Sequence, residues 1–335
     1  MTTKRKGGVT LADVARAAGV SESTASRAFT RPDLIRDDTV ERIKRFAAEL
    51  GYSVDPHARA LSTGRTQNIA LIVPDIANPF FPPLVREVES GAEQADFAVF
   101  LGDSDERASR EKVLVDRLSR QVDGFILASP RMPEEQIREL AARTPTVVIN
   151  RDVEGVHRVL VDAATGVREA VDLLAAMGHT SIAYLAGPAE TWADQERRAA
   201  VLGAAEAAGV RAGVIELGRP SYEAGRECVG SLIATGATAA VAFDDVIAHG
   251  VLAGFSLVGL NVPADFSVVG CDDVLAATTL PALTTVSGGS AASGAEALST
   301  LLALIDDSAT APERTAIDAH LVHRASVAPA RHIRR

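Results

Sequence analysis

Hydrophobic and polar residues near the start of the chain recur with the period of two short helices. Between Thr10 and Ala18, apolar residues fall at the three- and four-residue spacing of one helix face, and Thr10 stands in the N-cap position with Asp13 three residues later. Gly19 follows the last apolar residue, where a left-handed backbone is least costly for glycine, and Ser21 can cap a second helix. The pattern predicts two short helices joined by a tight turn.

A helix that follows such a turn can enter the major groove of DNA, so the residues on its outer face are candidates for reading bases. Arginine can donate two hydrogen bonds to guanine, glutamate can accept one from cytosine, and serine can reach bases or phosphates. The candidate DNA-binding residues are the two capping positions and the polar residues of the second helix: Thr10, Ser21, Glu22, Ser23, Thr24, Ser26 and Arg27. An ordinary helical hairpin with solvated charges is the alternative interpretation of this pattern.

A third helical pattern covers 38–50. One face of this predicted helix is apolar and consists of Val40, Ile43, Phe46, Ala47 and Leu50. This face is large enough to close a small three-helix core with the two preceding helices.

Short apolar runs alternate with helical patterns from Asn68 onward. The runs span 68–74, 97–102, 123–129, 146–150, 181–187, 239–243 and 267–270. Continuous apolar strands with helices between them indicate parallel sheets that are covered on both faces, so the predicted fold class is α/β. The repeat occurs in two blocks, about 66–163 and 164–288, which predicts two α/β units with a cleft between them.

Polar residues follow several of these apolar runs. They are Asp75, Asn78, Ser129, Asn150, Arg151, Asp244, Asp245, Asp272 and Asp273. Ligands bind outside the carboxyl ends of the strands in open α/β sheets, so these residues predict a small-molecule site in the cleft.

Composition and charge support a division of the chain. It has 335 residues, of which 47% are apolar, which is enough for more than one domain with a sizeable core. Residues 1–67 hold 12 Lys and Arg against 8 Asp and Glu, whereas the rest holds 22 against 36. A phosphate-binding surface needs a local excess of positive charge, so the net charge of −10 does not argue against DNA.

Several other classes of protein lack support in the sequence. No apolar run suits a signal peptide or a membrane span, so we expect a cytoplasmic protein without a membrane partner. Cys228 and Cys271 are far apart, and His320 and His323 fall on opposite faces of an apparent strand, so we expect no metal site. There is no GxSxG, no phosphate-binding loop, no HExxH and no strand-linked GxGxxG, so we expect neither catalysis nor a cofactor.

A series of motifs along the chain resembles the LacI family of bacterial transcription regulators. The motifs are VTLADVARAAGVSESTASRAF (9–29), GYSVDPHARALSTGRT (51–66), IALIVPDIANPFF (69–81), VDGFILASP (122–130), MGHTSIAYLAGP (177–188), AFDDVIAHG (242–250), VPADFSVVGCDD (262–273), LPALTTV (280–286) and LVHRASV (321–327). The resemblance implies a helix-turn-helix headpiece, a hinge helix and a core like that of periplasmic sugar-binding proteins.

The resemblance also implies a second DNA contact, at the segment 56–63. In the family this segment forms a hinge helix on operator DNA and places a leucine in the minor groove. Leu61 occupies that position, and Ala58 is small enough for two hinges to approach each other. A plain flexible linker is the alternative for a short segment with a proline at its start.

The family's effector contacts carry over to this chain residue by residue. Arg197 and Asp272 match the arginine and the aspartate that hold a hydroxyl-rich ligand, and bidentate groups suit that role. The other candidates are the strand-end residue Asp75, the polar ring Ser129, Asn150 and Asp244, the aromatic pair Phe80 and Phe81, and the single tryptophan Trp192.

The chain departs from the family pattern at three positions. The family commonly has asparagine where this chain has Asp244, glycine where it has Ala200, and an apolar residue where it has His249. One more carboxylate in the cleft favours a donor-rich or cationic ligand over an anionic one.

We therefore expect a headpiece over 1–55, a hinge helix or linker over 56–66 and an effector-binding and dimerisation core over 67–335. Within the core, we expect one subdomain from 67–163 plus 288–310 and another from 164–287 plus 311–330. The expected partners are double-stranded operator DNA, a small-molecule effector such as a sugar, and a second copy of the chain in a homodimer or tetramer. Three alternatives stay open: a purine- or nucleoside-responsive regulator, a helix-turn-helix protein whose core only dimerises, and a solute-binding protein.

Overall fold

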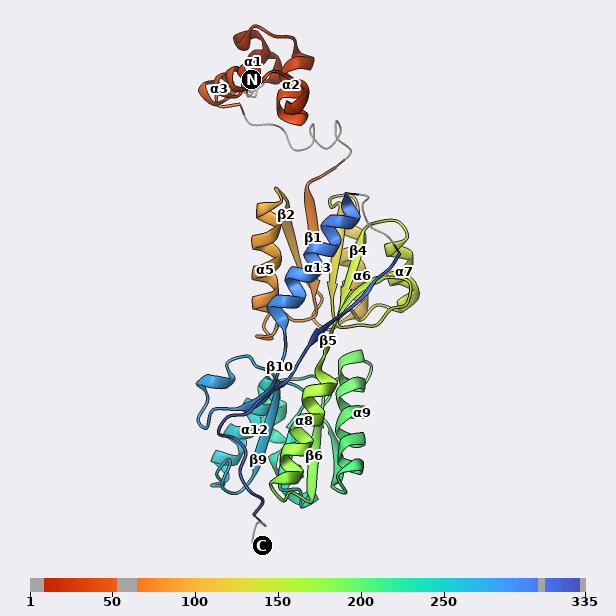
Figure 1. Ribbon diagram of the computed structural model, residues 1–335, viewed down its shortest axis with the longest axis vertical. Coiled ribbons are helices and arrows are strands. Elements are labelled where there is room, and N and C mark those ends of the chain that lie inside the picture. The colour runs from red at the N-terminus through yellow and green to blue at the C-terminus, as the bar shows by residue number, and fades with distance from the viewer. Residues whose placement is uncertain (1–8, 53–64, 307–310, 332–335) are drawn as a thin grey trace, which may run out of the picture. The chain divides into compact units, whose positions relative to one another are not determined.

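The computed structural model describes residues 9–52, 65–306 and 311–331 (Figure 1). The chain forms two compact units, Met1–Gln67 and Asn68–Arg335, and each is described by itself. The predicted hinge residues Ala58 and Leu61 lie outside the described residues.

The first unit is a bundle of short helices. Its elements are α1 (Leu11–Ala18), α2 (Glu22–Thr30), the 3-10 turn η1 (Pro32–Leu34) and α3 (Asp37–Leu50). The predicted caps are confirmed: the Asp13 amide donates to Thr10 Oγ1 over 3.4 Å, and the Thr10 amide donates to Asp13 Oδ2 over 3.0 Å. Gly19 ends α1 with φ of 66°, and Ser21 Oγ accepts a hydrogen bond from the Thr24 amide.

The core of this unit is small and apolar. Val14 from α1, Ala25 from α2 and Ile43 from α3 are each fully buried, as the apolar periodicity predicts. The prediction is wrong for Leu50, which is 39% exposed. It is the last residue of α3, beyond the part of the helix that α1 and α2 cover.

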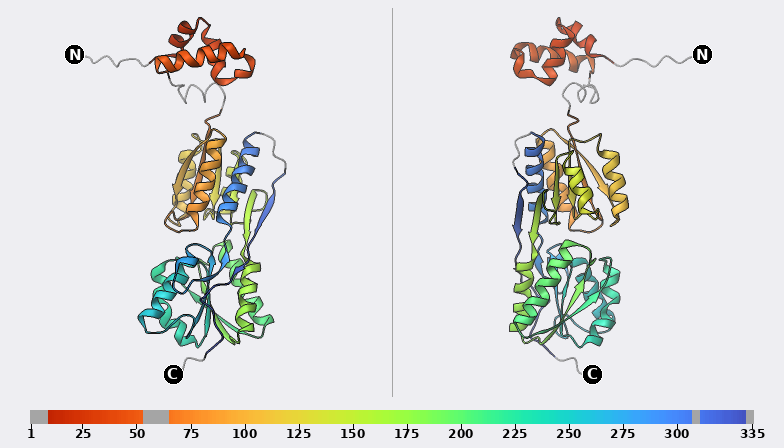
Figure 2. Two further views of the ribbon diagram at one scale, coloured as in Figure 1. Left: turned by 60° about the vertical axis from the view of Figure 1, so that its left-hand side comes forward. Right: turned by 90° about the vertical axis from the view of Figure 1, so that its right-hand side faces the viewer.

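The second unit contains two lobes, each built on one sheet. The first sheet has the strand order β11-β5-β4-β3-β1-β2 and is parallel throughout. Its strands are β1 (Asn68–Val73), β2 (Ala98–Asp103), β3 (Gly124–Ala128), β4 (Thr146–Ile149), β5 (His157–Asp162) and β11 (Arg314–Asp318). Its helices are α5 (Phe81–Gln94), α6 (Ala108–Leu118), α7 (Glu134–Ala141) and α13 (Ser290–Ile305). Apolar residues of α5 and α13 pack on one face, and those of α6 and α7 on the other (Figure 2).

The second lobe repeats this three-layer arrangement. Its sheet has the order β12-β10-β9-β8-β6-β7, and β12 alone of the paired strands in the described chain runs antiparallel. The strands are β6 (Ser181–Ala186), β7 (Arg211–Glu216), β8 (Ala239–Ala242), β9 (Ser267–Asp272), β10 (Thr284–Ser287) and β12 (Leu321–Val322). The helices are α8 (Ala163–Ala176), α9 (Trp192–Ala207), α10 (Tyr222–Glu227), α11 (Val229–Thr235), α12 (Asp245–Leu257) and the 3-10 turn η2 (Ala276–Thr278). The predicted α/β class with parallel sheets is confirmed.

The division of the C-terminal segment differs from the prediction. We expected residues 311–330 in the second subdomain, but β11 pairs with β5 in the first sheet, so the chain enters the second lobe only after Asp318. The strand β11 alternates exposed and half-buried residues at the edge of its sheet. A short strand of this kind carries no signal in its own sequence for which sheet it joins.

The strands that the apolar runs missed share a composition. The segment β5 begins with a histidine and ends with an aspartate, β7 begins and ends with charged residues, and β10 consists of two buried threonines, Thr284 and Thr285, followed by a valine and a serine. Such polar residues interrupt an apolar run even where the strand itself is buried, as β5 and β10 are. The seven runs that were predicted as strands all form strands.

The helix α9 allows a paired test of backbone conformation within one lobe. Gly203 lies in the exposed middle of α9 with open space around it, whereas Gly209 follows the helix with φ of 68°. We expect Gly203→Ala to raise the free energy of unfolding by about 0.5–1 kcal/mol, and Gly209→Ala to lower it by about 1–2 kcal/mol because of strain. Chemical denaturation of both variants measures this, and equal effects of the two substitutions would contradict the assigned helix end.

Candidate functional site

The outer surface of α2 presents a small set of polar side chains. Glu22, Ser23 and Arg27 are exposed, whereas Ser26 is half-buried. Within the described part of the first unit, no hydrogen bond or ion pair is recorded for the side chains of Glu22 and Arg27. These two side chains are therefore available to an external partner.

The other candidates on this unit have structural roles. Thr10 donates its hydroxyl to Asp13 Oδ2 over 2.7 Å, and Ser21 Oγ lies 2.8 Å from Thr24 Oγ1. These hydroxyls satisfy helix ends, which explains why the sequence has them at these positions. A phosphate oxygen accepts, so a hydroxyl binds it only by donating its single proton. Ser21 Oγ accepts the Thr24 amide and can still donate, whereas Thr10 would have to give up its bond to Asp13.

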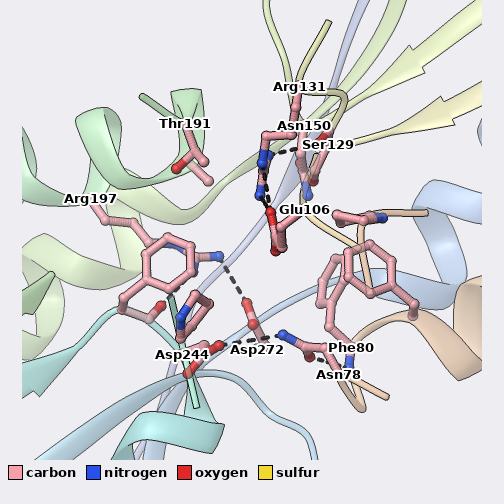
Figure 3. A pocket seen from close by; sticks show the side chains of 15 residues that line it. Asn78, Phe80, Glu106, Ser129, Arg131, Asn150, Thr191, Arg197, Asp244 and Asp272 are labelled. Atoms are coloured by element: carbon pink, nitrogen blue, oxygen red, sulfur yellow. Dashed lines mark hydrogen bonds and ion pairs between the residues drawn. The ribbon is translucent and has the colours of Figure 1, made fainter. Parts of the chain in front are cut away.

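A cavity lies between the two lobes of the second unit, at the carboxyl ends of their strands (Figure 3). It encloses about 520 Å³ of space that no protein atom fills, part of it open to solvent. Its lining from the first lobe is Pro74, Asn78, Phe80, Phe81, Glu106, Ser129, Arg131 and Asn150. Its lining from the second lobe is Thr191, Ala193, Arg197, Pro220, Phe243, Asp244 and Asp272.

The structure brings most of the predicted effector residues into this cavity. They are Phe80, Phe81, Ser129, Asn150, Arg197, Asp244 and Asp272. Three of them, Ser129, Asn150 and Asp272, have positive φ angles of 45°, 53° and 103°. Non-glycine residues rarely adopt this conformation, and such strain concentrates at functional sites.

A buried ion pair joins Arg197 and Asp272 in the second lobe. Arg197 Nη2 donates to Asp272 Oδ1 over 2.8 Å, and both side chains are less than 10% exposed. Arg197 Nη1 donates to the carbonyl of Phe243, and the guanidinium carbon lies 4.9 Å from the centre of the Phe243 ring. Nη1 and Nη2 thus each have an acceptor, whereas Nε is buried without a hydrogen-bond partner among the described residues.

A second ion pair lies on the opposite wall, and the sequence analysis missed it. Arg131 Nε donates to Glu106 Oε2 over 2.7 Å, and Arg131 Nη1 donates to the carbonyl of Ser129 over 2.7 Å. The buried Glu111 accepts the amides of Arg131 and Met132, which fixes this loop. Arg131 follows Ser129 by two residues in the same strand-end loop. The signal in the sequence is therefore the set of polar residues in the whole loop, and not only the first of them.

Asp244 is a cavity residue whose acidity its surroundings change. Its side chain is almost fully buried; Oδ1 accepts the Ile247 amide over 2.8 Å as the N-cap of α12, and Oδ2 lies 3.4 Å from Asn78 Nδ2 of the other lobe. Burial, together with repulsion from Asp272, raises the pKa of Asp244 to about 7. Asp244 therefore changes charge near neutral pH.

The structure places two predicted effector residues outside the cavity. Asp75 lies at the cleft edge, where it accepts a hydrogen bond from Arg219 of the second lobe over 3.2 Å. Trp192 lines a different depression, beside the strands β5 and β11. Its neighbours Thr191 and Ala193 do line the cavity, because successive residues at a helix start point about 100° apart, and a sequence cannot show which of them faces the ligand.

Two features are absent from the described residues. None of their helices is long and apolar enough to cross a membrane. Within the same ranges, His, Cys, Asp and Glu residues nowhere gather in a group of three that could hold a metal ion.

A three-helix unit with an exposed polar helix, carried on one chain with a two-lobed α/β unit that encloses a charged cavity, defines a class: DNA-binding proteins with a ligand-binding domain. Residues 10–55 match the family described as "Bacterial regulatory proteins, lacI family", and residues 171–327 match the "Periplasmic binding protein-like domain".

Similar proteins have the same organisation. The chain is 34% identical to the HTH-type transcriptional regulator DegA of Bacillus subtilis (strain 168) over 86% of this chain and 88% of DegA. The structure of a lac repressor dimer bound to operator and the anti-inducer ONPF superposes with a TM-score of 0.85 at 26% identity, covering 96% of this chain and all of that one. A complex of the transcriptional regulator CelR with cellobiose has a TM-score of 0.71 at 30% identity, covering 95% and 99%. The chain belongs to the LacI family and is a helix-turn-helix transcriptional regulator.

The raised pKa of Asp244 has a consequence for stability. The folded protein holds this proton to a higher pH than the unfolded chain, so the stabilising contribution is complete below the ordinary value of 3.8 and is lost as the pH rises through about 7. Asparagine has no proton to lose and is an equally good N-cap. We expect Asp244→Asn to melt above the wild type by a margin that grows from about pH 5 to about pH 8.

Thermal melting across this pH range measures the margin. Glu190→Gln, at an exposed position beside the cleft, is the control, and its melting temperature should follow that of the wild type. A margin for Asp244→Asn that stays constant with pH would contradict the raised pKa.

Proposed function

We propose that this protein represses transcription by binding an operator sequence, and that a sugar or related metabolite in the interlobe cavity sets its affinity for that operator. The observation that carries the proposal is the cavity itself. Its wall holds the buried Arg197, Asp244 and Asp272 of the second lobe and the half-buried Glu106 and Arg131 of the first. A core that served only dimerisation would have no need for buried ionic groups at this place, since unpaired burial of charge is costly.

On the DNA side, the proposed contacts are the polar residues of α2. Arg27 has the donors to bind guanine in a bidentate manner, and Glu22 has the acceptors for cytosine N4. Ser23 and Ser26 have short side chains whose hydroxyls can contact bases or phosphates. The hydroxyls of Thr10, Ser21 and Thr24 supply phosphate contacts. The minor-groove roles of Ala58 and Leu61 stay predictions that rest on the family resemblance.

On the effector side, the cavity chemistry suits a ligand rich in hydroxyl groups. The Arg197–Asp272 pair can give and take hydrogen bonds at once, which matches neighbouring hydroxyls. Phe80 and Phe81 are packed edge to face with ring centres 5.2 Å apart and offer an apolar surface. The similar regulator CelR binds cellobiose, which supports a carbohydrate. A purine or nucleoside is the alternative ligand.

We infer that the working form is a homodimer, or a pair of dimers. The similar lac repressor is a dimer on its operator. In this chain, β2 forms an edge of the first sheet, and its residues Phe100 and Leu101 are 38% and 42% exposed. Exposed apolar residues on a sheet edge favour burial against another surface.

We further propose that the protein acts in the cytoplasm and catalyses no reaction. Its relatives are transcriptional regulators. Binding energy for the effector then serves to favour one lobe arrangement over another, and not to lower a chemical barrier.

Substitution of Arg27 tests the DNA-reading role. We expect Arg27→Ala to lower the affinity for the operator by about 1–3 kcal/mol and to leave binding to unrelated duplexes nearly unchanged. Footprinting on DNA from around the protein's own gene identifies the operator, and gel-shift titration then measures both affinities. Arg143→Ala removes the same charge from the first lobe and should change neither. An equal loss on operator and unrelated DNA would remove Arg27 from base reading.

Substitution of Asp272 tests the cavity role. We expect Asp272→Asn to lose most of the rise in melting temperature that wild-type protein shows with binding members of a panel of sugars and nucleosides, because ligand binding stabilises by mass action. Operator binding without ligand should persist. Asp116→Asn, on exposed α6, is the control. An undiminished ligand response in Asp272→Asn would exclude this aspartate from the site.

A further inference from the structure

The interlobe cavity contains one carboxylate whose charge no cation balances directly. Glu106 is paired with Arg131, and Asp272 is paired with Arg197. Asp244 makes no ion pair with any residue in the described ranges. With its acids ionised, the lining therefore carries one more negative than positive charge.

We propose that the natural ligand of this cavity carries a protonated amine, which binds against Oδ2 of Asp244. The inference rests on the proposed function, since it names the chemistry of the effector for the same site.

The geometry of the two carboxylate oxygens supports this position. Oδ1 is occupied by the Ile247 amide at 2.8 Å. Oδ2 has only Asn78 Nδ2 at 3.4 Å, which is longer than the usual range of about 2.7–3.2 Å for such a bond. Asn78 is itself held in place, because its Oδ1 accepts the Phe80 amide over 2.9 Å. Oδ2 thus keeps capacity for a short, charge-assisted hydrogen bond.

The two arginines of the cavity do not favour an anionic ligand. Arg197 already donates to Asp272 and to the Phe243 carbonyl, and Arg131 already donates to Glu106 and to the Ser129 carbonyl. Arg197 Nε has no partner among the described residues and can donate one hydrogen bond to a ligand. An anion that took either guanidinium as its ion-pair partner would still displace a carboxylate and leave that carboxylate without its cation. That exchange costs several times more than a surface ion pair gains.

A neutral ligand supplies no cation to Asp244 when this carboxyl group is ionised. Burial and the nearby Asp272 raise the pKa of Asp244 to about 7, so near neutral pH the ionised form, which lacks a cation, and the protonated form have similar free energies. An ammonium group would relieve both effects at once, because it supplies the missing positive charge next to two carboxylates.

The mouth of the cleft has the same electrostatic character. A depression beside the cavity is lined by Glu106, Glu190 and Glu216, with Arg219 as its cation. Arg219 is shared between Asp75 and Asp105, and Glu216 is paired with Arg198. Of the acids that line this depression, only Glu190 has no ion pair with a described residue. Its unbalanced negative charge at the entrance attracts cationic ligands.

The experiment compares matched ligands by thermal shift on the full-length protein at about pH 7. The first arm uses hexoses and pentoses, their amino sugars with the amine at each ring position, and the N-acetyl derivatives, which keep the nitrogen and lose the charge. The second arm uses cytidine against uridine, where the amino group is a neutral donor. Titration of each binding ligand then gives its affinity in wild type, Asp244→Asn and the control Asp116→Asn.

We expect an amino sugar to bind more tightly than both its hydroxyl and its N-acetyl counterparts. Asp244→Asn should weaken that amino sugar by about 10- to 100-fold, the range of a hydrogen bond to a charged group, and should change neutral sugars little. Asp116→Asn should leave the preference for the amine intact, because this aspartate is exposed on α6 and lies outside both the cavity and its entrance.

Each other outcome overturns the proposal. If neutral sugars bind and no amino sugar binds more tightly, the charge assignment is wrong while the proposed function stands. If cytidine binds and the amino sugars do not, the ligand is a neutral donor. If Asp244→Asn leaves the preference unchanged, Asp244 is not the recognition site. If no member of the panel binds, both this inference and the proposed effector class fail.

Discussion

The structure of the cavity depends on one constraint: charged groups buried between the lobes need partners. The Arg197–Asp272 pair satisfies it within the second lobe, and Arg131–Glu106 satisfies it within the first. Breaking a buried pair by removing one member typically costs about 3–5 kcal/mol. Each lobe can therefore keep its own half of the site in place when the lobes move apart, because neither pair crosses between them.

The contacts that do cross between the lobes are weaker. Asn78 reaches Asp244 over 3.4 Å, and Arg219, which is 55% exposed on its side chain, reaches Asp75 and Asp105 over 3.2 and 3.1 Å. Exposed ion pairs contribute at most about 1 kcal/mol. Strong pairs within lobes and weak contacts between them allow a ligand of ordinary affinity to shift the balance between open and closed arrangements.

Much of this architecture follows from local sequence patterns. The capping residues Thr10 and Ser21 and the glycine turn set the helices of the first unit, because helix ends require satisfied amides whatever the surroundings. The continuous apolar runs located the central strands, and the polar residues after them located the cavity. The family resemblance then singled out Arg197 and Asp272 from among the many arginines and acids.

The remaining features depend on tertiary packing, which a sequence pattern does not contain. The edge strand β11 could join either sheet, and its partner β5 was itself unrecognised. Trp192 seemed suited to stacking, but the start of α9 directs its neighbours Thr191 and Ala193 into the cavity. Arg131 escaped notice because its role comes from Glu106 and Glu111, which are more than 15 residues away in the chain.

The central claim is that the cavity and the DNA-reading helix are coupled. It is tested most directly by measuring the operator affinity of the full-length protein with and without a saturating amount of a ligand that binds the cavity. Coupling free energies of about 1–3 kcal/mol predict a change of about 5- to 150-fold. An operator affinity that stays the same when the cavity is filled would contradict the account.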